Sequence, residues 1–386
     1  MLATPDLVRV EEVVRPARPP AEMDARCYAR LPTPFHMWRG GELHEAKLAY
    51  EYWGELNDER DNAILLFTGL SPSAHARSSV RDPSAGWWEA MIGPGLAIDT
   101  NRFFVVCVNA LGSCFGSTGP RSIDPATGQA YRLSFPDISI EDIAHTAHAA
   151  VRSLGIERLY SVIGASLGGT VVLAFAALYP DAARGLVSIS GTAAASPFAM
   201  ALRSIQREAV RSDVRWQNGN YAFSQPPIAG MRLARKLGTV TYRSAEEWAA
   251  RFGRAPISAE WWRVEPFAAE FSVESYLESQ AMRFVTRFDA NCFLYLSRAI
   301  DRFNLADHGG SNIAALQGSK LKRALIIGVE SDMLFRIEEQ ARIAEAFSAA
   351  GTPTEFVPLS CPQGHDSFLV AEQPFGDAIR AHLNRL

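Results

Sequence analysis

The sequence predicts an α/β fold in which a mostly parallel, doubly wound sheet carries an inserted all-helical lid. Short apolar runs alternate with helical segments over residues 43–191 and again after residue 318. This alternation is typical of a parallel sheet with helices on both faces. Over residues 197–318 the strand pattern fades and apolar residues recur at helical spacing, which indicates helices.

The same segments predict three parts of the chain. Residues 1–35 mix Glu, Arg and Pro without an apolar stretch, so we expect an N-terminal arm and no secretory signal. Residues 36–196 and 316–386 form the core domain, and residues 197–315 form the helical lid. A core with an insertion accounts for 386 residues, which is long for a single domain.

Apolar runs predict strands at residues 47–53, 62–67, 103–108, 159–163, 323–329 and 354–359. The helix between the third and fourth strands begins at Ser139 and Asp142, a Ser-x-x-Asp capping box, and ends at Gly155. A capping box satisfies two free N–H groups at the start of a helix, and glycine is the usual residue after its end.

Gly164-Ala165-Ser166-Leu167-Gly168 lies between the strand at 159–163 and an apolar helix. A serine in such a bend adopts a strained backbone that exposes its hydroxyl above the sheet, and the glycines remove side chains that would collide there. The bend predicts the α/β-hydrolase fold with Ser166 as a nucleophile.

A nucleophilic serine needs a histidine base, which follows it in the chain in this fold. Three histidines follow Ser166. His365 lies in a loop directly after the strand at 354–359, whereas His308 has no strand before it. His382 lies in a closing helix, where we expect a solvated position. We therefore predict His365 as the base.

The acid that orients the base should also follow a strand. The apolar run at 323–329 leads into Glu330, Ser331 and Asp332. Asp332 stands further past the strand end and is preferred, with Glu330 as the alternative. The lid lies between Ser166 and Asp332 in the chain, so we expect it to fold over the site that they form.

The loop after the strand at 62–67 has a predicted part in the same chemistry. In α/β hydrolases this loop donates one backbone N–H to the oxyanion hole, and the residue after the nucleophile donates the other. The expected donors are Leu70 and Leu167.

Composition excludes several other functions. The net charge of −4 gives no reason to expect nucleic-acid binding. Five cysteines without Cys-x-x-Cys spacing predict neither a disulfide framework nor a metal site. No segment has the run of about 18 apolar residues that a membrane span requires. We expect a cytoplasmic enzyme.

Beyond these features the chain resembles the homoserine O-acetyltransferase family from about Phe35 to the C-terminus. The resemblance rests on the bend at Ser166 and on segments spaced along the chain: Gly86–Glu89, Ile92–Gly95, Asn109–Pro120, Asp137–Asp142, Gly230–Arg235, Arg287–Asn291 and Gly364–Asp366. It implies an acyl-CoA-dependent amino-acid O-acyltransferase that works through an acyl-serine intermediate. It also implies a homodimer with no bound cofactor, acyl-CoA being a cosubstrate.

By the same resemblance, Arg232 and Asp366 hold the zwitterionic amino acid. A solvated lid face remains the alternative for Arg232, and support of His365 remains the alternative for Asp366.

The sequence indicates the acceptor amino acid and the acyl group less directly than it indicates the catalytic residues. Ser71-Pro72-Ser73-Ala74 and Glu278–Ala281 depart from the homoserine enzymes and are similar to the serine O-succinyltransferases of the same family. This favours L-serine and cysteine biosynthesis, with L-homoserine and methionine biosynthesis as the alternative. A pocket separates substrates that differ by one methylene by only about 1–3 kcal/mol.

A succinyl carboxylate needs an arginine, for which Arg203, or Arg207 one turn later, is the candidate. Leu334 stands where homoserine succinyltransferases of the family often have arginine, so acetyl-CoA stays open as the donor beside succinyl-CoA. An esterase that uses the same residues with water is the rival function.

Overall fold

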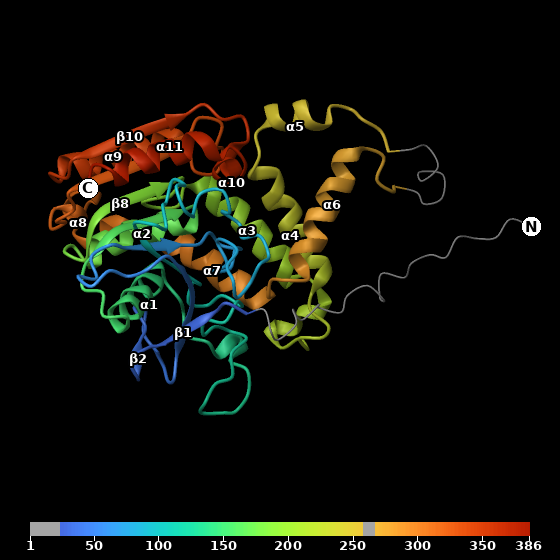
Figure 1. The fold of residues 1–386 in the computed structure, drawn as a ribbon. Helices are drawn as coiled ribbons and strands as arrows, with labels where there is room; N and C mark the ends of the chain where they lie inside the picture. Colours follow the sequence, from blue (N-terminus) through green and yellow to red (C-terminus); the bar gives the residue numbers. More distant parts are fainter. Residues whose placement is uncertain (1–23, 258–266) are drawn as a thin grey trace, which may run out of the picture.

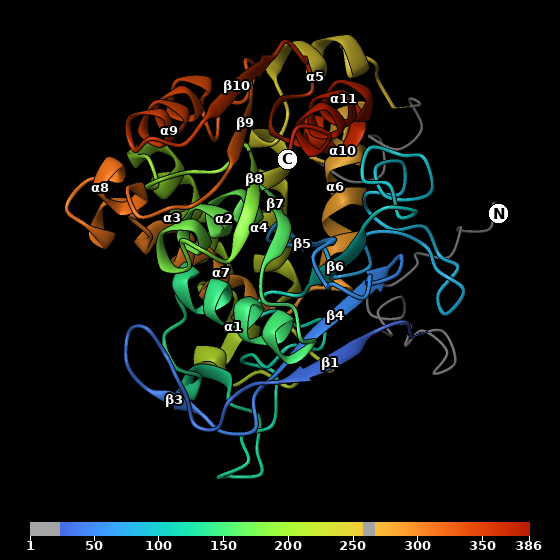
Figure 2. The ribbon, with the colours of Figure 1, turned by 60° about the vertical axis from the view of Figure 1, so that its left-hand side comes forward.

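The computed structural model of the protein describes residues 24–257 and 267–386. Its centre is an eight-stranded sheet in the order β1-β4-β6-β5-β7-β8-β9-β10, which can be followed across Figure 2. Strand β4 is antiparallel to both neighbours and the other pairs are parallel, which confirms the predicted class of fold. The strand bounds are β1 Cys27–Arg30, β4 Lys47–Trp53, β5 Ala63–Phe67, β6 Phe104–Val108, β7 Leu159–Ala165, β8 Ala183–Ile189, β9 Arg323–Val329 and β10 Thr354–Leu359; β2 (Phe35–His36) and β3 (Glu42–Leu43) form a separate pair.

Both faces of the sheet are covered. Successive residues of a strand point to opposite faces, so Leu65 of β5 joins the apolar core on one side and Leu66 joins the core on the other. The first side contains α1 (Ile140–Ser153), α2 (Leu167–Leu178) and α9 (Ile337–Ala349), and the second contains α11 (Glu372–Leu383). Burial on both faces explains why the strands are continuous apolar runs in the sequence.

Helix α1 begins and ends as its sequence predicts. The Ser139 side chain accepts the Asp142 N–H, and the Asp142 carboxylate accepts the Ser139 N–H. Gly155 follows the helix with φ of +75°, a left-handed conformation that glycine adopts without steric cost.

Helices fill the described part of the chain between β8 and β9. Helix α4 packs on α3 and on α6, and Figure 1 shows α4, α5 and α6 beside the sheet rather than against its faces. Helix α7 differs, because nearly all its side chains are buried in the main core. The bounds are α3 Pro197–Arg211, α4 Ile228–Thr241, α5 Ala245–Phe252, α6 Ser272–Val285, α7 Ala290–Arg302 and α8 Asn312–Leu316.

The segment expected to form an N-terminal arm contributes to the sheet. Residues 27–30 form β1, which pairs antiparallel with β4 and places Cys27 opposite Tyr50. Within β1 only Ala29 is buried, so this edge strand lacks the apolar pattern by which the other strands were predicted. The body of the protein therefore begins inside residues 1–35.

His382 also differs from expectation, because it is fully buried on α11 rather than solvated. It packs against Gly185 of β8, where a Cβ would lie 2.2 Å from Leu386 Cδ1 and 3.1 Å from His382 Nε2, so the glycine makes room mainly for Leu386. Burial lowers the pKa of His382 to about 3, so the imidazole is neutral.

All five cysteines lie in the described residues and are free thiols. Among the described helices, none has the length and apolar character needed to cross a bilayer.

The cap of α1 can be tested by Ser139→Ala. Because this change removes an N-cap acceptor, the free energy of unfolding should fall by about 1 kcal/mol in urea denaturation. Ser348→Ala, at an exposed position of α9, is the control and should stay within about 0.5 kcal/mol of the unchanged protein. Equal effects of the two changes would contradict the capping interaction.

Candidate active site

Ser166 stands at the bend between β7 and α2 with φ of 56° and ψ of −117°, a region that non-glycine residues rarely occupy. A Cβ at Gly164 would lie 2.2 Å from the Gly168 carbonyl oxygen, and one at Gly168 would lie 2.5 Å from the Phe67 carbonyl oxygen. Only glycine fits at either position. The packed backbone therefore holds Ser166 in its strained conformation.

Two further side chains form a hydrogen-bonded chain with Ser166. His365 Nε2 lies 2.8 Å from Ser166 Oγ, and His365 Nδ1 lies 2.7 Å from Asp332 Oδ2. Asp332 follows β9, and His365 follows β10 in a short turn, η4 (Gly364–Asp366). Strands β7, β8, β9 and β10 are parallel neighbours in the sheet. The three residues follow the carboxyl ends of β7, β9 and β10, which lie at the same edge of the sheet. Glu330, the alternative acid, is exposed.

The hydrogen bonds around Asp332 fix the direction of the imidazole. Asp332 Oδ1 accepts the N–H groups of Leu334 and Phe335, which leaves Oδ2 to accept the N–H of His365 Nδ1. The lone pair of Nε2 then faces the Ser166 hydroxyl, as proton removal requires. Burial disfavours the charged imidazolium, but the adjacent Asp332 carboxylate outweighs burial and raises the pKa of His365.

Of the two expected oxyanion donors, Leu167 follows Ser166 directly and Leu70 lines the same cavity as Ser166. Leu167 is the first residue of α2, and an N–H at the start of a helix is free to bind an anion. Leu70 lines a small cavity of about 30 Å³ together with Ser166. The roles of these two backbone N–H groups in an oxyanion hole stay predictions.

The lid supplies most of the remaining wall of this cavity. Arg203 of α3, Tyr242 after α4 and Ser297 of α7 line it. The Tyr242 ring lies 5.8 Å from the ring of His365. Nothing in the sequence pattern distinguishes Tyr242 from an ordinary helix-end residue, so sequence reasoning did not identify it.

Arg203 is almost completely buried at 5% exposure. Its Nε donates to Asp301 Oδ1 at 2.5 Å. The same carboxylate accepts a hydrogen bond from Arg207, which does not line the cavity. Among the described residues the buried Nη2 of Arg203 has no hydrogen-bond partner, so one donor of this guanidinium is available for a ligand.

Asp366 and a lid arginine flank the base, although the arginine is not the expected one. Arg232 forms an ion pair with Glu278 at 2.6 Å and its guanidinium is directed toward α6. Arg235, three residues later, lies close enough to Asp366 to favour its charged form. Burial nevertheless dominates and raises the pKa of Asp366. Rotation about the axis of α4 decides which arginine faces the site, and the sequence does not specify that rotation.

Asp366 is also held by the protein itself. It forms an ion pair with Arg243 Nε at 3.2 Å, and its N–H donates to the Tyr242 carbonyl. The Nε of Arg235 is buried and has no hydrogen-bond partner within the described residues. Asp366 thus lies next to the base with Arg235 nearby. In the part of the chain that the structure describes, the Nε of Arg232 is unpaired in the same way as that of Arg235.

The segment Ser71–Ala74 continues from Leu70 along the edge of the site. Ser71, Pro72 and Ser73 are partly exposed, whereas Ala74 is fully buried. The Ala74 N–H donates to Asn109 Oδ1 at 2.6 Å. Ser71, Pro72 and Ser73 therefore keep part of their surface accessible, whereas Ala74 does not.

No group of three His, Cys, Asp or Glu side chains within the described residues could hold a metal ion.

Fold and site together define an α/β hydrolase. The family model for the alpha/beta hydrolase fold matches residues 62–371. A serine O-succinyltransferase of Litchfieldella anticariensis is 55% identical over 361 residues, which span 93% of this chain and 98% of the relative. The chain therefore belongs to the α/β-hydrolase-fold family, and within it to the family of this serine O-succinyltransferase, as its sequence indicated.

Two solved structures are also similar. A homoserine O-acetyltransferase from Bacillus anthracis gives a TM-score of 0.85 at 26% identity and covers 94% of this chain and 98% of its own. The esterase E22 gives a TM-score of 0.84 at 29% identity, with 93% and 99% covered. The same architecture thus occurs in proteins named for acyl transfer and for ester hydrolysis.

The Asp332–His365 contact predicts a shift in pH dependence. Only neutral His365 can accept a proton, so its raised pKa places the acidic limb of the pH–rate profile above the ordinary histidine value. Asp332→Asn removes the charge that raises this pKa, and the limb should move to lower pH. The rate should fall by about 10⁴-fold, since the imidazole also loses its orientation.

Glu330→Gln is the matched control for this experiment, because Glu330 is exposed on the same loop. It should change neither the rate nor the pH profile. If Glu330→Gln moved the limb and Asp332→Asn did not, Glu330 would be the acid.

Proposed function

We propose that the protein is a serine O-acyltransferase that moves a succinyl group from succinyl-CoA to the hydroxyl of L-serine, a step toward cysteine. The proposal is carried by Arg203, which lines the cavity of Ser166 and whose buried Nη2 has no hydrogen-bond partner among the described residues. The serine O-succinyltransferase at 55% identity supports it.

In the first half-reaction Ser166 Oγ attacks the thioester carbonyl and His365 takes the hydroxyl proton. The N–H groups of Leu70 and Leu167 stabilise the oxyanion. The carbon–sulfur bond then breaks, and His365 returns its proton to the sulfur, so that free coenzyme A leaves and Ser166 remains acylated.

In the second half-reaction the L-serine hydroxyl replaces coenzyme A. His365 removes the proton of the L-serine hydroxyl, and the hydroxyl oxygen attacks the acyl carbon. The bond between the acyl carbon and Ser166 Oγ then breaks, and His365 passes the proton to Ser166 Oγ. The product is an O-acyl serine and free enzyme. Water competes for the same acyl group, so the lid serves transfer by excluding water.

The acceptor is a zwitterion and needs one cation and one anion. We assign the cation to Arg235, in the role expected of Arg232, because Arg232 is already paired with Glu278. The anion is Asp366, beside the base. Ser71, Pro72 and Ser73 limit the length of the acceptor side chain and thereby favour serine over homoserine.

The donor's carboxylate meets Arg203. Asp301 orients the guanidinium through Nε, and Nη2 then donates to the succinyl carboxylate. An acetyl group would leave this buried donor unsatisfied, which disfavours acetyl-CoA.

The proposal is tested by measuring thiol release from succinyl-CoA and acetyl-CoA with L-serine, with L-homoserine and without acceptor. Release should be fastest with succinyl-CoA and L-serine, and Ser166→Ala should abolish it without changing the thermal unfolding temperature. Release that depends on homoserine would move the enzyme to the methionine route. Release that needs no acceptor would make it a hydrolase of the thioester, and transfer by Ser166→Ala would refute the mechanism.

Donor selection is tested by Arg203→Leu. Loss of a hydrogen bond to a charged group should lower kcat/KM for succinyl-CoA by about 10- to 100-fold and should affect acetyl-CoA much less. Arg207→Leu is the matched control, because Arg207 binds the same Asp301 carboxylate but lies outside the cavity. Equal losses with both donors would exclude Arg203 from succinyl recognition.

A further inference from the structure

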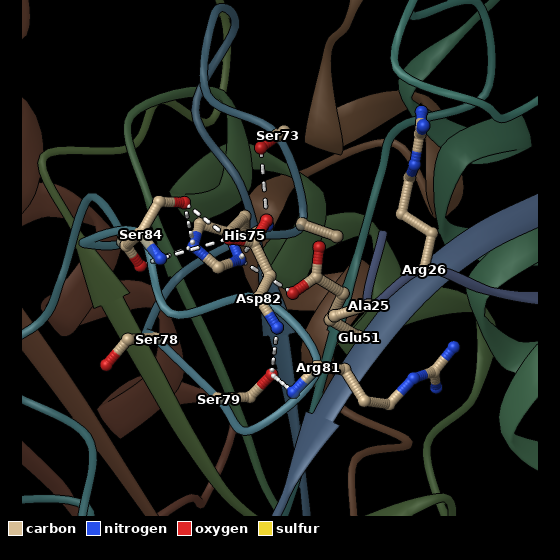
Figure 3. Close-up of polar contacts among 12 residues, drawn as sticks. Ala25, Arg26, Glu51, Ser73, His75, Ser78, Ser79, Arg81, Asp82 and Ser84 are labelled. Carbon is tan, nitrogen blue, oxygen red and sulfur yellow. Dashed lines mark hydrogen bonds and ion pairs between the residues drawn. The ribbon is translucent and has the colours of Figure 1, made fainter. Parts of the chain in front are cut away.

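A largely buried ion pair joins the loop that follows β5 to strand β4. His75 Nδ1 is 2.8 Å from Glu51 Oε2 on β4, and the two side chains are only 14% and 5% exposed. Figure 3 shows the His75 ring between Glu51 on one side and Ser84 on the other. The reaction as described above uses neither residue.

The hydrogen-bond partners of His75 favour its positively charged form. Its Nε2 lies 2.9 Å from the Ser84 carbonyl oxygen, which can only accept a hydrogen bond. Its Nδ1 faces the Glu51 carboxylate. Ser84 Oγ lies 3.2 Å from Nε2 but donates its proton to Asp82 Oδ1. With Glu51 ionised, both ring nitrogens therefore face acceptors, and the imidazolium satisfies both because it has two N–H groups, whereas a neutral imidazole has one. Consistent with this, the hydrogen bond to Glu51 raises the pKa of His75 to about 9.

Other charges face this pair from the neighbouring segments. Asp82 Oδ2 lies 3.9 Å from His75 Nδ1 and also favours the imidazolium. Arg26, before β1, and Cys107 of β6 both lie within electrostatic reach of Glu51. Burial opposes the charge on His75, and Glu51 outweighs it.

The ion pair connects the loop to the sheet at a point close to the active site. His75 is five residues after Leu70 in the sequence. Its own N–H donates to Ser73 Oγ at 3.3 Å, and its carbonyl accepts the Trp87 N–H. The Trp87 indole donates to the Ser73 carbonyl at 2.9 Å. The side chain of His75 thus ties this hydrogen-bonded loop to β4.

We propose that His75 is a positioning residue whose ion pair with Glu51 holds the loop of residues 68–76 in place. That loop carries the oxyanion donor Leu70 and the acceptor-facing residues Ser71, Pro72 and Ser73, so this inference rests on the proposed function. His75 touches no reacting atom and acts through the backbone of the loop.

The sign of the pH dependence follows from the charge. A histidine whose pKa is raised by folding stabilises the folded loop fully below its ordinary pKa. That contribution is lost as the pH rises through about 9. The rate should therefore have an alkaline limb near that pH. Glu51→Gln removes the partner charge, and the limb should move to lower pH.

The experiment compares Glu51→Gln, His75→Gln and the double variant with the unchanged protein. Acylation of Ser166 is followed by the burst of nitrophenol from p-nitrophenyl acetate, and transfer is followed by thiol release with L-serine. Each single variant should lower the burst rate by about 10- to 100-fold at neutral pH, because the oxyanion donor is misplaced. KM for the ester should change by less than about threefold, since ground-state binding does not use the donor. The double variant should lose no more than either single variant.

His44→Gln is the matched control. His44 pairs with Glu42 at 3.0 Å, but both side chains are about half exposed and neither lies on the loop. This variant should retain the unchanged burst rate and pH profile.

The outcomes separate this inference from the proposed function. Unchanged burst rates in folded Glu51→Gln and His75→Gln, or an alkaline limb that stays in place in Glu51→Gln, would overturn the positioning role. Thermal unfolding verifies folding, and a loss of rate with an unmoved pH profile would indicate a purely structural role and would also overturn it. If the unchanged protein acylates with the ester but transfers nothing to serine, the proposed function fails while the burst experiment still tests His75.

Discussion

The position of the nucleophile depends on one steric constraint, the contact of three backbone segments at the end of β7. The carbonyl oxygens of Phe67 and Gly168 come so close to Gly168 and Gly164 that no side chain fits. This contact fixes the left-handed backbone of Ser166, the first N–H groups of α2, and the end of β5 from which the Leu70 loop starts. The same backbone contact therefore fixes the position of Ser166 relative to the start of the loop that carries Leu70.

The charged side chains of the site differ in how many of their hydrogen-bonding atoms have a partner within the protein. Asp332 accepts hydrogen bonds at both oxygens, which suits a group that only orients and stabilises the base. Arg203 keeps a buried donor without a partner in the described chain. Since an unsatisfied buried donor costs about 1–3 kcal/mol, a ligand carboxylate that completes it gains specificity as well as affinity.

Features set by local sequence were predictable, and features set by packing were not. The apolar strand at 323–329 and the capping box of α1 follow from the chain itself. Strand β1 has a single buried residue and is formed only because β4 offers a free edge. Arg235 lies near Asp366 because of how α4 is rotated on its neighbours, and His382 is buried against β8, where Gly185 makes room mainly for Leu386 beside it. Such contacts between distant segments carry no local signal.

Helix α7 limits how the site can open. It forms part of the cavity wall through Phe293, Ser297 and Ile300, yet most of its other side chains are embedded in the main core. Moving it would expose that core, at a cost comparable to local unfolding. The insertion therefore cannot move away from the site as one rigid body, because α7 is part of the main core. Helices α4, α5 and α6 bury fewer of their side chains than α7 does, so one insertion combines a helix embedded in the core with helices packed mainly on other helices of the insertion.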